Sequence, residues 1–196
     1  MKDVLPGFDG SQLDNLIDFH TYTSMPLLLV WRAGLLPGAL GAVLLLPLLA
    51  SAYGFSQVNA KTDDGFFLGF PSYWNIVALY LYMFAASPGV STAIIVTLSV
   101  ATFVPTRYLY ASRGGPFART INVGAGIWFV LLALMLWTTG ATSHTVAIVS
   151  LAYPVLYLTL SGVVTLRHTR AGWVPPAGQV RRPISGSNAP GHDAPV

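Results

Sequence analysis

The chain has 196 residues, of which only 17 are charged: ten are Lys or Arg, seven are Asp, and there is no Glu. Hydrophobic residues make up 54% and the mean hydropathy is +0.61, whereas a soluble domain has about a quarter charged residues. This composition excludes a soluble domain, and a surplus of only three positive charges excludes a nucleic-acid-binding surface. The lack of Cys excludes disulfides, thiolate metal sites and a Cys nucleophile. We therefore expect a membrane protein.

Apolar segments predict six membrane-spanning helices. A span needs about 20 mostly apolar residues, and Pro, Gly and polar residues divide the chain into candidate spans at 13–36, 38–55, 73–87, 90–110, 120–139 and 144–166. The short links between several of them allow only tight hairpins, which make neighbouring helices antiparallel. The expected fold is all-α: one polytopic transmembrane helical bundle of about six spans over residues 1–170.

The basic residues predict the orientation in the membrane. With the N-terminus inside, nine of the ten Lys and Arg residues fall on the cytoplasmic side, and only Arg32 lies outside. An even number of spans also returns the C-terminus to the cytoplasm. We expect a bacterial inner membrane protein with both termini cytoplasmic. Residues 171–196, which include five Pro and four Gly, are predicted to be a disordered cytoplasmic tail.

Two carboxylates at the start of the first span are the sharpest local signal. Asp14 and Asp18 are four residues apart, and Gly10 lies one turn earlier, so all three share one face of a helix. Like charges at this spacing repel, and a divalent cation bound to their oxygen atoms would relieve the repulsion. Alternatively, both Asp residues complement the positive end of the helix dipole. The spacing alone does not decide between these roles.

The run Gly10-x3-Asp14-x3-Asp18 resembles the second half of the signature of the CDP-alcohol phosphotransferases, D-x2-D-G-x2-A-R-x8-G-x3-D-x3-D. These are integral membrane enzymes. Three further blocks are similar to the members of that family that use choline: FHTY at 19–22, GFFLGFPSYWN at 65–75 and PTRYLYASR at 105–113. The resemblance covers about residues 3–170 in order and spacing.

The resemblance implies transfer of the phosphatidyl group from CDP-diacylglycerol to choline, with release of CMP and with Mn²⁺ or Mg²⁺ as cofactor. By position, it implies that Asp14 is a metal ligand, that Asp18 is the general base and a further ligand, and that Gly10 leaves room for the nucleotide. Metal would neutralise the pyrophosphate, while a carboxylate assists attack by the alcohol. The expected partners are CDP-diacylglycerol, choline and membrane lipid, without nucleic acid, and a homodimer remains open.

The first half of the signature is absent from the chain. Only Asp9 and Asp64 are followed by Gly, and the residues three before them are Pro6 and Lys61. The resemblance also implies about two further spans before Met1. We therefore expect the chain to lack an N-terminal part of such an enzyme. Because two carboxylates are too few for a two-metal site, we predict that the 196-residue chain alone is inactive.

Further candidate substrate-binding residues follow the second and fourth spans. Asp64 and Trp74 lie on the same side of the membrane as Asp14, and aromatic faces with nearby carboxylates recognise a quaternary ammonium. A choline pocket there competes with interfacial anchoring of the aromatic side chain. Arg107 and Arg113 are candidates for the phosphate oxygens of the nucleotide lipid. Alternatively, both only set the topology.

Two other functions remain open. A CDP-alcohol phosphotransferase that uses serine, inositol or glycerol phosphate would share the chemistry of Asp14 and Asp18. A non-catalytic transporter or scaffold would account for the hydropathy, but it would place polar groups near the bilayer midplane. Here the ionisable residues gather at one face, which favours chemistry at the membrane surface.

Overall fold

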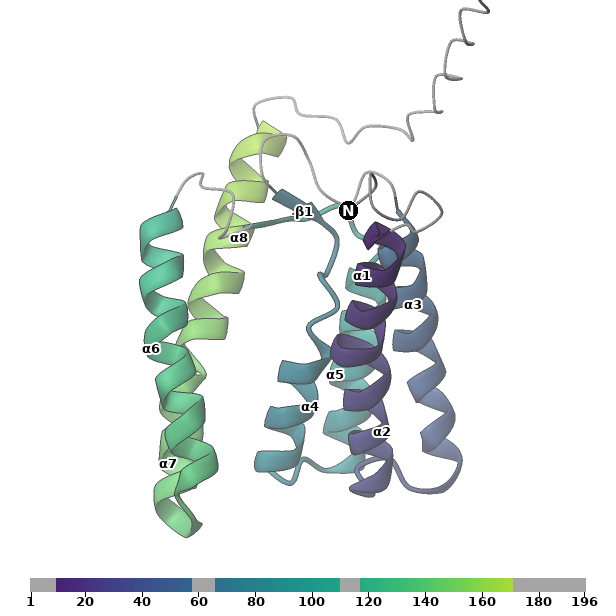
Figure 1. Ribbon diagram of the computed structural model, residues 1–196, viewed down its shortest axis with the longest axis vertical. Helices are drawn as coiled ribbons and strands as arrows, with labels where there is room; N and C mark the ends of the chain where they lie inside the picture. The colour runs from purple at the N-terminus through teal and green to yellow at the C-terminus, as the bar shows by residue number, and fades with distance from the viewer. Residues whose placement is uncertain (1–9, 58–65, 110–116, 171–196) are drawn as a thin grey trace, which may run out of the picture.

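The structure is a computed structural model that describes residues 10–57, 66–109 and 117–170 (Figure 1). Its elements in chain order are α1 (Gly10–Asp18), η1 (Phe19–Ser24), α2 (Met25–Arg32), η2 (Gly38–Leu44), α3 (Leu45–Ser56), β1 (Phe66–Leu68), α4 (Trp74–Met83), α5 (Pro88–Ala101), β2 (Arg107–Leu109), α6 (Ala118–Trp137), α7 (Gly140–Ser150) and α8 (Ala152–Arg170). Segment η1 is a π-helix and η2 is a 3₁₀-helix. The predicted all-α fold is confirmed, with one short strand pair added.

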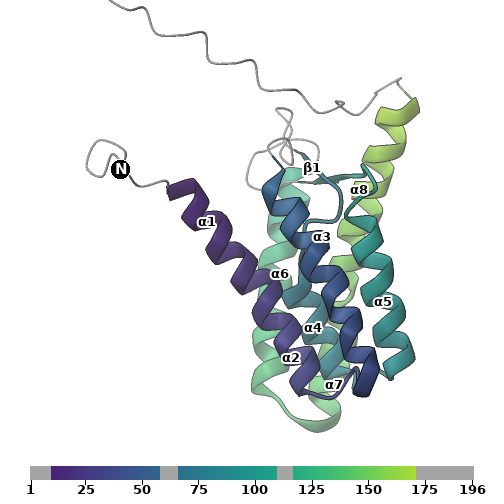
Figure 2. The same cartoon turned by 90° about the vertical axis from the view of Figure 1, so that its right-hand side faces the viewer.

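The first helical rod is continuous from α1 through η1 into α2. Both Asp18 and Met25, which flank η1, have right-handed helical backbone angles, so the chain changes its hydrogen-bonding pattern without breaking. Helix α2 buries Leu27 and Val30 in the bundle, whereas α1 leaves Leu13 exposed. In Figure 2, α2 lies beside the other helices, whereas α1 leans away from them.

Among the described residues, three helical segments are long and apolar enough to cross a membrane: Gly38–Ser56, Ala118–Trp137 and Gly140–Arg167. They match the predicted spans at 38–55, 120–139 and 144–166. Helices α4 and α5 are apolar but shorter. A membrane-spanning helical protein is thus confirmed, while the count of six spans stays a prediction.

The predicted helix over 90–110 is wrong beyond Ala101. Helix α5 ends there, and Arg107–Leu109 instead forms strand β2, which pairs antiparallel with β1. The physical reason is Pro105, which has no N–H to donate and disfavours the helical conformation in Val104 before it. The chain therefore leaves the helix and pairs with the loop that follows α3.

Gly69 allows the loop between β1 and α4 to pass close to the end of α5. Its φ is +80°, and a Cβ built there would lie 2.2 Å from the carbonyl oxygen of Thr102. The backbone N–H of Gly69 donates to Thr106 O at 3.0 Å, and that of Phe70 donates to Ala101 O at 3.2 Å. This loop sets α4 below the strand pair (Figure 1).

A chain of side-chain hydrogen bonds joins α4 to α6 and α7. The indole N–H of Trp128 donates to Tyr80 Oη at 2.9 Å, and Tyr80 Oη lies 2.7 Å from Ser150 Oγ. Because the hydroxyl of Ser150 donates to Ala147 O at 2.8 Å, Tyr80 must be the donor to Ser150. Helices α1–α5 are therefore connected to α6–α8 by this chain of hydrogen bonds. A second connection is made where the backbone of β2 donates hydrogen bonds to α8.

The strand pair marks one end of the molecule, which we call the β-pair end. Helix α1 starts there, α6 starts there and α8 finishes there (Figure 1). Most of the charged side chains within the described residues belong to these elements or to the strands themselves: Asp14, Asp18, Arg107, Arg119, Arg167 and Arg170. Arg32, at the C-terminal end of α2, lies toward the opposite end. The predicted gathering of ionisable residues at one face therefore holds for the described part of the chain.

Candidate functional site

Asp14 and Asp18 lie one helical turn apart on α1, so the expected helical spacing is confirmed. Asp14 is exposed and Asp18 is half-buried. Gly10 begins the same helix, and a Cβ placed on it would meet nothing within 4 Å. The three residues are thus brought together on a helix that projects from the bundle (Figure 2), with open space around Gly10.

The π-helical segment η1 follows Asp18 directly and attaches α1 to the bundle. The ring of Phe19 packs edge-on against Phe55 of α3, with ring centroids 6.2 Å apart. Thr21 Oγ1 donates to Ile17 O at 2.9 Å, which links the segment back to α1. Since π-helical turns occur frequently at functional sites, the position of η1 beside Asp18 supports a functional role for this part of the rod.

The carboxylate oxygens on α1 are suitable ligands for a divalent cation, but α1 supplies only two carboxylates. Carboxylate oxygens are the ligands that Mg²⁺ and Mn²⁺ prefer. Within the described residues, however, no group of three or more Asp, Glu, His or Cys side chains is placed to hold a metal ion. Asp14 and Asp18 therefore make at most half of a metal site.

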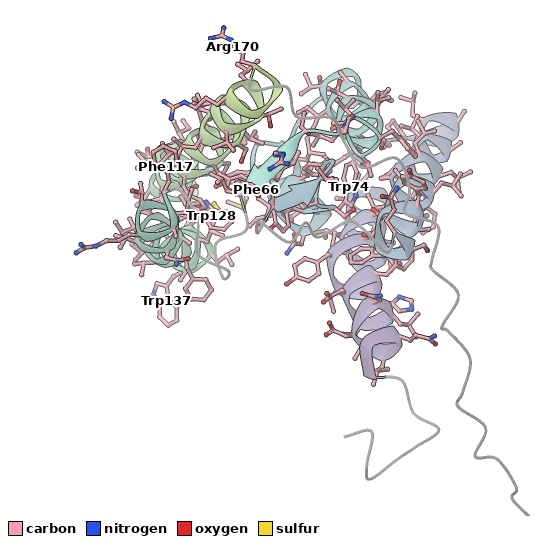
Figure 3. The ribbon with its side chains drawn as sticks, turned by 90° about the horizontal axis from the view of Figure 1, so that it is seen from above. Phe66, Trp74, Phe117, Trp128, Trp137 and Arg170 are labelled. Atoms are coloured by element: carbon pink, nitrogen blue, oxygen red, sulfur yellow. The ribbon has the colours of Figure 1, made fainter. Side chains whose placement is uncertain are left out.

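Arg107 lies on a different element from the carboxylates, in strand β2. Its side chain is buried, with the guanidinium carbon 5.2 Å from the centroid of the Phe66 ring. Its backbone N–H donates to Thr165 Oγ1 of α8 at 2.8 Å. Figure 3 shows Phe66 near the centre of the β-pair end, while α1 projects to one side. The structure does not bring Arg107 to Asp14.

Trp74 packs in the core. It is fully buried, its indole N–H donates to Ser51 Oγ at 2.8 Å, and its ring meets Phe70 edge-on at 5.3 Å. This position does not favour direct contact with choline, and the choline-pocket role stays a prediction. Asp64 and Arg113 fall outside the described residues.

Sequence reasoning missed a cavity next to Arg107. The cavity has a volume of about 190 Å³ and lies between residues 106–108 and helix α8, from which Ser161, Gly162 and Thr165 line it. From the sequence, this part of α8 is predicted only as an apolar span. The available signal was the pair of hydroxyl residues four apart with a Gly between them, on one face of the helix.

Comparison with known proteins identifies relatives of the chain. The chain is 42% identical to the phosphatidylcholine synthase of Legionella bozemanae over 115 residues, which cover 58% of this chain and 53% of that protein. It is 33% identical to the phosphatidylcholine synthase of Pseudomonas aeruginosa over 141 residues, 69% of this chain and 58% of that one. The chain is a homologue of phosphatidylcholine synthases. The resemblance drawn from the sequence blocks is thereby confirmed.

The homology is partial in extent. A further phosphatidylcholine synthase, from Legionella pneumophila, is 42% identical over 119 residues, which cover 58% of this chain and 45% of that protein. The chain thus spans about half the length of the phosphatidylcholine synthases it matches. No family model matches the chain, and no solved structure does.

Proposed function

We propose that the chain is part of a phosphatidylcholine synthase, which transfers the phosphatidyl group of CDP-diacylglycerol to choline and releases CMP. The observation that supports this most is the homology to phosphatidylcholine synthases of several bacteria, together with two carboxylates one turn apart on α1. We further propose that it resides in the bacterial inner membrane with both termini cytoplasmic, since the described basic residues other than Arg32 lie at the β-pair end.

In the proposed reaction Asp18 acts as the general base. Its carboxylate takes the proton of the choline hydroxyl, the hydroxyl oxygen forms a bond to the phosphatidyl phosphorus, and the bond from that phosphorus to the CMP oxygen breaks. Half-burial of Asp18 suits this role, because the proton acceptor then faces less competing water. Gly10, with open space at its Cβ position, allows the nucleotide to approach α1.

Mn²⁺ or Mg²⁺ is the proposed cofactor, with Asp14 and Asp18 supplying two of its ligands. When bound, such an ion neutralises pyrophosphate charge and improves CMP as a leaving group. The further ligands must come from the substrate, from water or from groups outside the described residues, because the described part of the chain offers no third acidic, His or Cys side chain at this place.

The experiment compares the 196-residue chain with a form translated in frame from DNA upstream of the Met1 codon. Each is purified in detergent and supplied with CDP-diacylglycerol, Mn²⁺ and radiolabelled choline. We expect no phosphatidylcholine from the chain alone and formation by a longer form that supplies the first half of the signature. Product from the chain alone would contradict the incomplete-site argument. Product from serine, inositol or glycerol phosphate instead of choline would contradict the proposed acceptor.

The same assay tests the proposed base. In the active longer form, Asp18→Asn removes the proton acceptor at constant size and is expected to lower kcat by about 10²-fold or more, with helix content unchanged by circular dichroism. Asn15→Asp on the same helix serves as the control, because Asn15 is exposed and lies off the Asp14–Asp18 face. Unchanged turnover in the Asp18→Asn form would refute the assignment.

A further inference from the structure

We propose that the cavity between β2 and α8 binds a glycerophospholipid through its phosphodiester group, at a site separate from the carboxylates of α1. Its volume of about 190 Å³ equals that of about six water molecules at ~30 Å³ each, which is enough for a phosphodiester. The proposal concerns binding alone and does not depend on the proposed transferase activity.

The positive charge at this site comes from Arg107. Its side chain is only 3% exposed, although it lines the cavity, and the ring of Phe66 at 5.2 Å stabilises the buried cation. A guanidinium binds phosphate oxygens in a planar, bidentate fashion. A buried arginine at the wall of a small cavity is therefore suited to a phosphate group.

Helix α8 fixes the frame that holds Arg107. Thr165 Oγ1 accepts the backbone N–H of Arg107 at 2.8 Å, and Ser161 Oγ accepts that of Leu109 at 3.3 Å. The hydroxyl of Tyr157 donates to Leu109 O at 3.1 Å. Three side chains of α8 thus hold the short strand in place, so the cavity is built by the fold and not by a loose surface contact.

The polarity of the cavity wall along α8 matches that of a phospholipid. Of the cavity residues on α8, Leu158 lies farthest from the β-pair end, and its side chain is 46% exposed. Gly162 follows one turn later, and Thr165 lies nearest the β-pair end. At about 1.5 Å per residue, Leu158 lies ~10 Å farther along the helix axis from the β-pair end than Thr165 does. An acyl chain along Leu158 would place the phosphate beside Thr165 and Arg107. A soluble phosphate would not use the apolar end.

Two exposed arginines continue the same helix beyond the cavity. Arg167 and Arg170 lie within the last four residues of α8, and basic residues at a membrane surface attract anionic lipids. They increase the local concentration of the ligand without lining the cavity. The occupant that best fits the site is therefore an anionic glycerophospholipid.

Gly162 provides the sharpest test, because a Cβ there would meet nothing within 4 Å. Gly162→Leu fills the cavity without backbone strain. Gly126→Leu is the matched control, since Gly126 is also helical and also has open space at its Cβ position. The purified 196-residue protein in maltoside micelles is titrated with phosphatidylglycerol, with diacylglycerol or with inorganic phosphate, and bound species are counted by native mass spectrometry.

The expected result is saturable binding of phosphatidylglycerol by the wild type and by Gly126→Leu, and binding about tenfold or more weaker in Gly162→Leu and in Arg107→Gln. Equal binding by Gly162→Leu would overturn the site. Equal binding of diacylglycerol would overturn the role of the phosphate, and binding of inorganic phosphate in place of lipid would overturn the lipid occupant. Because Gly162→Leu leaves the buried Arg107 in place, loss of folding in Arg107→Gln does not remove the test.

Discussion

The hydrogen-bonded chain from Trp128 through Tyr80 to Ser150 predicts a measurable loss of stability when its middle hydroxyl is removed. Tyr80→Phe deletes the acceptor of the Trp128 indole N–H, at 2.9 Å, and the donor to Ser150 Oγ, at 2.7 Å. A single hydrogen bond contributes about 1 kcal/mol in proteins, and about 0.6 kcal/mol on average between membrane helices. Ser150 keeps its bond to Ala147 O, whereas Trp128 loses its acceptor. We therefore expect a loss of about 1–2 kcal/mol.

The assay is reversible unfolding in bicelles by steric trapping, which gives the free energy of unfolding of a helical membrane protein. Tyr82→Phe is the control, because Tyr82 lies on the same helix and is 53% exposed. A Tyr80→Phe change no larger than that of Tyr82→Phe would refute the reasoning. A double-mutant cycle with Trp128→Phe adds a second check: the two effects should not add, since both substitutions delete the same bond.

Two further changes follow from the backbone and from one buried hydroxyl, and both are read from thermal unfolding in detergent. Gly69→Ala should lower the free energy of unfolding by about 2 kcal/mol or more, because the new Cβ meets Thr102 O at 2.2 Å and φ is +80°. Gly89→Ala is the control, because the Cβ position of Gly89 is open, and it should not lower the free energy of unfolding by this amount. Thr23→Val should raise the midpoint, since Thr23 Oγ1 is buried and makes no hydrogen bond and a buried unsatisfied hydroxyl costs about 1–3 kcal/mol. A lowered midpoint for Thr23→Val would show that the hydroxyl is satisfied.

The parts of the fold that depend on local sequence were predictable. Apolar length alone located the long helices at 38–56, 118–137 and 140–167, and the four-residue spacing of Asp14 and Asp18 placed them correctly on one helical turn. Strand pairing was not predictable, because Phe66–Leu68 and Arg107–Leu109 have three residues each and lie far apart in the chain. The cavity beside Arg107 depends on that pairing and on α8, so the spacing of Ser161 and Thr165 could indicate a polar face on that helix but not the cavity itself.

Trp74 shows how a backbone detail overrides a sequence expectation. A Trp following a loop suggests a position at the membrane surface. In the structure the preceding loop has positive φ at Gly69 and Ser72, and it carries the chain below the strand pair before α4 begins (Figure 1). The indole therefore reaches Ser51 in the core. Positive φ at a Ser is rare and has no sequence signal of its own.

The π-helical segment sets the angle at which the carboxylates point. Each residue of an α-helix turns the chain by about 100°, whereas the wider turns of Phe19–Ser24 absorb extra residues without breaking the rod. If Phe19–Ser24 formed regular α-helix with the same number of residues, α1 would be rotated about its axis relative to α2 by roughly 100°, which would move Asp14 and Asp18 together to another side. The direction of the acidic face therefore depends on the π-helical conformation of η1, and deleting one residue there, which would allow regular α-helix, should leave that face nearly where it is.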